Sequence, residues 1–89
     1  MKFRVEWSLR AQKQMRKFDK SISELLLRWV HKNLDGCTNP RQHGKALTAN
    51  HAGQWRYRVG DYRLIAEIED DKVIILILSV GHRKEIYEN

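Results

Sequence analysis

Residues 53–71 read GQWRYRVGDYRLIAEIEDD, which has the pattern of a β-hairpin. A Gly-Asp dipeptide at 60–61 suits a two-residue turn, and apolar residues alternate with polar ones on both sides of it. Such a turn places Arg58 opposite Arg63, with Arg56 on the same face because side chains alternate along a strand. We therefore predict one basic face and one aromatic and aliphatic face on this hairpin.

The predicted pair of facing arginines suggests an anion site. Like charges directly opposite each other on a sheet repel, so a sheet that keeps them is suited to bind an anion. The same cations could instead form a solvated strand face that prevents edge-to-edge aggregation. Charge is also unevenly distributed, because Asp61 is the only acid between positions 41 and 63, whereas residues 67–71 carry four acids.

The composition describes one small basic domain, residues 1–89. The chain carries 17 Lys and Arg against 11 Asp and Glu, a net charge of +6, which favours a nucleic acid or another anionic partner. The single cysteine, Cys37, excludes an internal disulfide. No spacing of His and Cys resembles a zinc site, so we expect neither a metal nor another cofactor.

Membrane association and export are not expected. No apolar run approaches the length needed to span a membrane, and the N-terminus MKFRVEWS lacks the apolar core of a signal peptide. We therefore expect a cytoplasmic protein.

The N-terminal half predicts a strand and two helices. Residues 2–7 alternate as a half-buried strand, and Ser8 is placed to cap a helix that runs to Phe18. Ser21 and Glu24 have the spacing of a capping box for a second helix, and Gly36 follows that helix. Three further residues are assigned by pattern: Met15 and Trp29 to the core, and His43 to the surface or a loop.

The C-terminal half predicts the rest of the sheet. Residues 37–53 are turn-rich, and Ala46 and Leu47 could hold this loop to the core. Residues 72–80, KVIILILSV, fit a central strand that is buried on both faces. The expected fold is an α+β domain of order β-α-α-β-β-β, with both helices on one face of a mainly antiparallel sheet and the arginines exposed on the other.

Three segments carry a resemblance to a known family: HGKAL (43–47), WRYRVGDYR (55–63) and VGHRKEIY (80–87). Their order resembles the RelE family of bacterial toxins, within the RelE/ParE superfamily, and the resemblance covers essentially the whole chain. It implies a microbial-RNase-like fold and a metal-independent endoribonuclease that cuts mRNA in the ribosomal A site, so that translation is inhibited. It also implies a cognate antitoxin protein that wraps and inactivates the toxin.

The same resemblance implies roles for individual residues. The catalytic set falls on Arg58, Arg63, His82, Arg83 and Tyr87, and the RNA-binding set on Lys45, Arg56 and Lys84.

The chemistry of these side chains fits such roles. Guanidinium groups match phosphate oxygens and stay charged, so Arg63 and Arg83 suit stabilisation of the transition state. Histidine is the side chain suited to proton transfer at neutral pH, which makes His82 a candidate, and Tyr87 could transfer a proton or stack on a base. In a strict strand His82 would share the arginine face and Arg83 would not. Gly81 permits a bulge or a strand ending, so we expect the chain to leave regular strand geometry near Gly81.

Two other functions remain open at this stage. A ParE-like toxin of the same fold would inhibit DNA gyrase without cutting RNA. A noncatalytic module would bind RNA or protein through the same basic face. The arginine cluster together with a terminal tyrosine favours the ribonuclease.

Overall fold

The structure of the chain is a computed structural model that describes residues 1–48 and 51–85. Its elements are β1 (Arg4–Trp7), α1 (Leu9–Lys17), α2 (Lys20–Asn33), β2 (Lys45–Ala46), β3 (Trp55–Val59), β4 (Tyr62–Glu69) and β5 (Ile74–His82). Within these residues one sheet has the order β1-β5-β4-β3-β2. The pair β1–β5 is parallel, and the other pairs are antiparallel.

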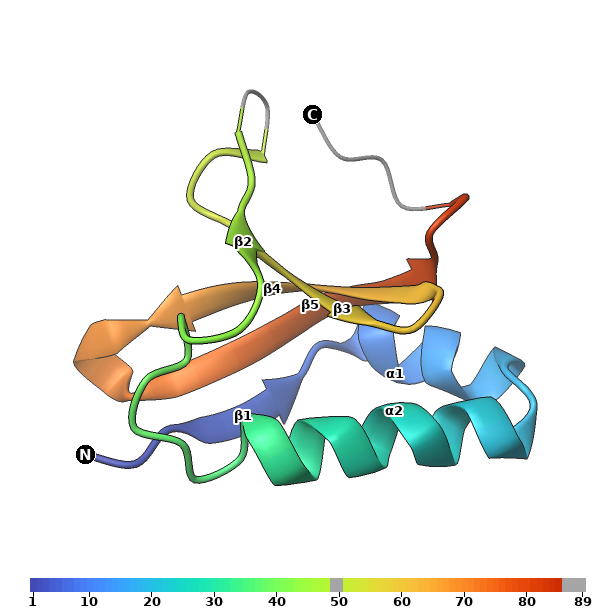
Figure 1. The fold of residues 1–89 in the computed structure, drawn as a ribbon, viewed down its shortest axis with the longest axis horizontal. Coiled ribbons are helices and arrows are strands. Elements are labelled where there is room, and N and C mark those ends of the chain that lie inside the picture. Colours follow the sequence, from blue (N-terminus) through green and yellow to red (C-terminus); the bar gives the residue numbers. More distant parts are fainter. Residues whose placement is uncertain (49–50, 86–89) are drawn as a thin grey trace.

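Both helices cover one face of this sheet (Figure 1), which confirms the predicted α+β architecture. The core fills the space between the two layers. Its fully buried side chains include Leu26, Leu34, Tyr57, Leu64, Ile75 and Ile77. The helices leave the opposite face of the sheet, the open face, uncovered (Figure 1).

The first helix begins as predicted. The Ser8 hydroxyl oxygen accepts a hydrogen bond from the Ala11 amide at 3.1 Å, as a serine N-cap should. The same hydroxyl donates to the Leu78 carbonyl at 2.8 Å, which ties the helix start to β5. α1 then lies along the edge of β5 where β1 has ended, and the Gln14 side-chain oxygen accepts from the Val80 amide at 2.7 Å.

The predicted capping box of the second helix is wrong. α2 begins at Lys20 after the N-cap Asp19, whose carbonyl accepts hydrogen bonds from the amides of Ile22 and Ser23. Only Phe18 and Asp19 separate the two helices, so the chain turns directly into α2. The Ser23 hydroxyl instead donates to the Met15 carbonyl at 2.7 Å and joins the two helices.

The hairpin has the predicted register. Arg58 lies opposite Arg63 and Val59 opposite Tyr62. Gly60 has a φ of +60°, while Asp61 does not adopt a positive φ, which is the pattern of a type II′ turn. Glycine is needed at the first turn position because a side chain there would strain the left-handed backbone.

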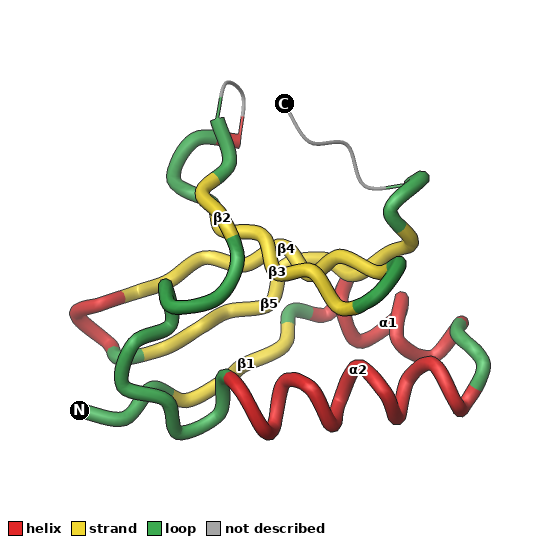
Figure 2. Tube along the Cα trace, in the orientation of Figure 1, coloured by secondary structure: helices red, strands yellow, loops and turns green. Residues whose placement is uncertain are grey.

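The turn-rich segment contains one element that the sequence did not predict. Figure 2 shows a long loop between α2 and β2, after which β2 adds a short strand to the edge of β3. Leu47 is buried, as expected of a residue that holds the loop, but Ala46 is exposed.

β5 is an interior strand flanked by β1 and β4, but β4 is the middle strand of the sheet. Leu76 and Leu78 of β5 remain half-buried, so the expectation of complete burial on both faces is only partly met. No helix in the described residues is long and apolar enough to cross a membrane.

Candidate nucleic-acid interface

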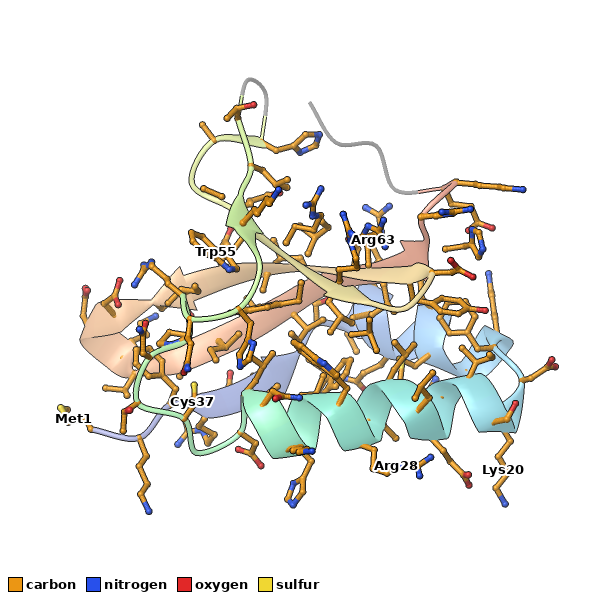
Figure 3. All side chains as sticks on the ribbon, in the orientation of Figure 1. Met1, Lys20, Arg28, Cys37, Trp55 and Arg63 are labelled. Carbon is orange, nitrogen blue, oxygen red and sulfur yellow. The ribbon has the colours of Figure 1, made fainter. Side chains whose placement is uncertain are left out.

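Four basic residues share the open face of the sheet. Arg58 is paired with Arg63 across β3 and β4, and Lys45 with Arg56 across β2 and β3. Since Arg56 and Arg58 are two residues apart, all four side chains start from the same face. Figure 3 shows Arg63 on the side of the sheet opposite the helices. The register therefore confirms the predicted common face of the arginines and adds Lys45 to it.

The expected exposure of this face is wrong for two of its arginines. Arg56 is 8% exposed and Arg63 is 7% exposed, whereas Arg58 lies open to solvent. Arg63 sits between Arg58 and Gly81 in the sheet. Its Nη1 donates to the carbonyls of Gly60 at 3.3 Å and Tyr62 at 3.2 Å, which turns the guanidinium back over the hairpin turn.

The burial of Arg63 favours electrostatic stabilisation of a transition state. A guanidinium held by neighbouring carbonyls needs less reorganisation when it meets a phosphate. Coulomb interactions are also stronger where water is partly excluded. Arg63 is therefore a fixed cation, and Arg58 is an adaptable one.

Lys45 and Arg58 are available to a ligand. Among the residues that the structure describes, neither side chain forms an ion pair or a hydrogen bond. Both are exposed, and each is the cross-strand partner of a buried arginine, Lys45 of Arg56 and Arg58 of Arg63. They can contact an anion without first breaking an internal contact.

His82 does not lie on the arginine face, which corrects the sequence-based expectation. It is paired with Tyr62, and the two rings meet edge to face at 5.5 Å. Tyr62 also meets Phe18 of the helix layer, with the ring centres 5.4 Å apart, so His82 lies toward the helix side at the end of the sheet. Its Nδ1 accepts from the Lys84 amide at 3.2 Å, so neutral His82 carries its proton on Nε2.

Regular strand geometry ends near Gly81, as predicted. β5 continues through Gly81 to His82, and a turn follows at 83–85. The Arg83 amide donates to the Asp61 carbonyl at 2.7 Å, which brings Arg83 beside the hairpin turn. Its Nε lies 3.8 Å from an Asp61 carboxylate oxygen, and both side chains are exposed. Lys84 is exposed, and Tyr87 lies outside the described residues.

The open face also has an apolar part that the sequence analysis missed. A cavity of about 340 Å³ lies beside the arginines, and its apolar lining consists of Leu47, Ile65 and Leu78. Ile65 is only 6% exposed, although it occupies the polar phase of the hairpin. In the sequence, Ile65 stands between Arg63 and Glu67 on the same face of the strand. This apolar residue was the signal that could have predicted the apolar part.

Two groups of the core, Tyr57 and Cys37, have altered acidity for structural reasons. Burial raises the pKa of Tyr57, whose hydroxyl donates to the Pro40 carbonyl at 2.7 Å, so this tyrosine holds the loop and is not a proton donor for chemistry. Burial also raises the pKa of the Cys37 thiol, which is half-buried against the core. The described residues contain no cluster of three His, Cys, Asp or Glu side chains that could hold a metal ion.

The comparisons with solved structures define the fold class. A chain in the crystal structure of the RelBE2 toxin–antitoxin complex of Mycobacterium tuberculosis is similar with a TM-score of 0.85 and 28% identity, covering 93% of each chain. A chain of the intact E. coli RelBE toxin–antitoxin complex is similar with a TM-score of 0.70, covering 90% of this chain and 95% of that one; at 22% identity it supports the fold alone. The fold is RelE-like.

Sequence comparisons define the family. Residues 5–87 match the model of the ParE toxin of type II toxin–antitoxin system, parDE. Toxin RelG of Mycobacterium tuberculosis is 30% identical over 87 residues, which cover 98% of both chains. The chain belongs to the RelE/ParE superfamily of toxins of type II toxin–antitoxin systems.

Proposed function

We propose that this toxin is a ribosome-dependent endoribonuclease that cuts mRNA in the A site and thereby stops translation in the cytoplasm. The observation that carries the proposal is the convergence of Arg56, Arg58 and Arg63 on the open face. Arg83 lies beside the hairpin turn at one end of that row. The similarity to Toxin RelG and to the RelBE2 chain supports the ribonuclease over the other functions of the superfamily.

The proposed reaction uses the nucleophile that RNA already carries. The 2′-hydroxyl oxygen attacks the adjacent phosphorus, the bond to the 5′ oxygen breaks, and the products are a 2′,3′-cyclic phosphate and a 5′-hydroxyl. Arg63 and Arg58 stabilise the negative charge that grows on the phosphorane oxygens, which lowers the transition state more than the ground state. Arg56 and Lys45 position the strand.

Proton transfer needs other groups because guanidinium stays protonated at all relevant pH values. His82 could serve only from the end of the sheet, because its ring lies beside Tyr62 and away from the arginine row. Of His82 and Tyr87, Tyr87 is therefore the preferred candidate for proton transfer. No metal ion is assigned a role in the proposed mechanism.

Primer extension on mRNA from translating ribosomes tests the proposal. The wild-type toxin should produce cuts within A-site codons, and Arg58→Ala should reduce them. Arg28→Ala is the matched control, because Arg28 is exposed on α2 (Figure 3). Chelator-treated toxin should cut equally well when the ribosomes retain their magnesium. Absence of cuts with active ribosomes and folded wild-type toxin would refute the proposal.

Inhibition of DNA gyrase is the second candidate, and the ParE description of the matching family model favours it. A supercoiling assay with purified gyrase separates the two. The ribonuclease proposal expects supercoiling to continue at toxin concentrations that stop translation. A noncatalytic binding module would leave both mRNA and supercoiling unchanged.

We also propose that an antitoxin covers the toxin on both sides. A groove of about 950 Å³ between β1, α1 and α2 has a mixed lining, whose apolar part includes Trp7, Met15, Phe18 and Leu27 and whose polar part includes Glu6, Gln12, Arg16, Lys20 and Ser23. Apolar side chains of a partly disordered partner would fill this groove, and its acidic side chains would approach Arg58. The RelBE2 structure supports this proposal because its toxin was crystallised as a toxin–antitoxin complex.

A further inference from the structure

A separate cavity opens beside the basic face, at the edge of β3. Its volume is about 370 Å³, and its lining consists of Trp29, His43, Gly44, Lys45, Arg56 and Arg58. This volume falls within the range of about 300–1,000 Å³ that is usual for small-ligand sites. β2 pairs only with Trp55 and Arg56, so in the described part of the chain it leaves the edge of β3 at Arg58 uncovered. The cavity lies at the part of the β3 edge that β2 does not cover.

The charge of the cavity favours an anion. The described residues that line it include three permanent cations and one histidine, and none is acidic. Lys45 faces Arg56 across the strand pair, so the sheet itself holds two cations together. Lys45 and Arg58 are the exposed cations of this lining, and both can contact a phosphate.

Aromatic rings form the other wall. The Trp29 ring lies 5.8 Å from the His43 ring at an angle of 71° and contacts Tyr57 beneath it. Trp29 and His43 are each half-buried, so part of each ring remains open to the cavity. Aromatic rings beside cations are the combination that proteins use to bind single-stranded RNA, with bases on the rings and phosphates on the cations.

The loop that carries His43 is held firmly in place. The Trp55 indole nitrogen donates to the His43 carbonyl at 2.6 Å. Gly44 has a φ of +83°, and a Cβ there would lie only 2.2 Å from the Arg56 carbonyl oxygen. Glycine therefore permits a close approach between this loop and β3. A site built in this way loses little entropy when a ligand binds.

We propose that this cavity is a subsite for one nucleotide of the RNA strand, adjacent to the nucleotides on the arginine face. Lys45 and Arg58 would bind its phosphate, and Trp29 and His43 would contact its base. Arg56 and Arg58 border both the cavity and the arginine face, so one strand can occupy both. The inference rests on the proposed function, because it takes RNA as the substrate, and it extends the RNA footprint around the edge of β3.

Indole signals in ¹H–¹⁵N spectra of the ¹⁵N-labelled toxin provide the first test. The probe is a 2′-O-methyl RNA hexamer, which lacks the nucleophile and stays intact. We expect the hexamer to shift the Trp29 signal and to leave Trp7, on the far side of the molecule, unchanged. Polyglutamate of equal charge should not reproduce the shift. An unmoved Trp29 signal at saturation, or an equal shift with polyglutamate, would overturn the subsite.

Binding affinity provides the second test. His43→Ala should weaken hexamer binding about fivefold or more, the lower range for loss of one stacked base. Lys45→Gln should reduce the slope of log K against log salt concentration by about 0.7, the value for one phosphate contact to a single strand. Lys13→Gln, which removes an exposed charge from α1, should leave the slope unchanged. Equal slopes for Lys45→Gln and wild type would contradict the proposal.

The outcomes separate the subsite from the proposed function. If the wild-type toxin cuts mRNA on ribosomes but the Trp29 signal and the salt slope do not respond, the subsite fails and the function stands. If hexamer binding responds as expected but no mRNA is cut, the subsite stands and the function fails.

Discussion

Each face of the sheet contains buried residues, but those residues have opposite chemistry on the two faces. On the helix side, Val59 is 5% exposed; on the open side, Arg56 and Arg63 are 8% and 7% exposed. Hydrocarbon burial stabilises the fold, whereas burial of a cation costs free energy unless hydrogen bonds and opposite charge compensate. The helix side therefore stabilises the fold, and the open side holds a row of cations, Lys45, Arg56, Arg58 and Arg63.

The largest expected effect comes from the helix side. Ile75 is fully buried between the sheet and the helices, so Ile75→Ala should lower the free energy of unfolding by about 2–5 kcal/mol. Urea denaturation followed by circular dichroism measures this loss. Leu25→Ala is the control, because Leu25 is 44% exposed and should change stability by less than about 0.5 kcal/mol. Equal losses for the two variants would refute the assigned core.

Arg63→Ala should have the next largest effect, and on activity more than on stability. We expect cleavage on ribosomes to fall roughly a hundredfold or more, by analogy with the loss of one oxyanion donor. Arg83→Ala should show a comparable loss. Because Arg63 is buried, the free energy of unfolding of the Arg63→Ala variant must be measured together with its cleavage rate. A folded Arg63→Ala variant with nearly normal cleavage would remove this residue from the catalytic set.

Association with the antitoxin should be affected less. Arg58→Glu should slow association about tenfold at low salt and reduce its salt dependence, because the exposed guanidinium attracts an acidic partner. Leu27→Ala in the helix-side groove should mainly speed dissociation. Stopped-flow mixing measures both rates. Unchanged association with Arg58→Glu, and also with Arg58→Glu combined with Arg63→Glu, would place the antitoxin away from the basic face.

The smallest effect concerns the ion pair between Arg41 and Asp70, whose two contacts are 3.0 and 2.8 Å. The hydrogen bond to Arg41 lowers the pKa of Asp70, so the pair stabilises the fold above the carboxylate's unfolded pKa. This contribution should disappear as pH falls through the lowered folded value. Asp70→Asn should therefore reduce the melting temperature slightly at neutral pH and not at strongly acidic pH. A constant difference at every pH would contradict the assignment.

Local signals made the hairpin predictable. The turn dipeptide and the alternation around it fixed the register, and the register fixed the pairing of Arg58 with Arg63. Ser8 was predictable for the same reason, because a cap acts within one turn of its own helix.

Contacts between distant segments were not predictable. Arg56 is paired with Lys45 and Arg63 with Gly81, and both partners come from other strands. β2 has only two residues and therefore no periodicity to read.

The face of His82 was predicted wrongly because β5 is apolar on both sides. Its sequence therefore does not show which residues point to which face of the sheet. A register shift against β4 at Ile65 and Ala66 also breaks strict alternation along the strand pair. Val80 is 1% exposed in the helix-side core, which assigns His82, two residues later, to that side. The pairing of His82 with Tyr62 agrees with this assignment.

The contact between Gln14 and β5 has a consequence for self-association. β1 ends opposite Ile77, so the later part of β5 has no strand beside it on that side within the described residues. A bare strand edge is a template on which a second chain can add a strand. Gln14 occupies the Val80 amide that such an addition would use, and Ser8 occupies the Leu78 carbonyl. α1 thus covers the open edge of β5. The side chains of Ser8 and Gln14 prevent a second copy of the toxin from adding a strand there.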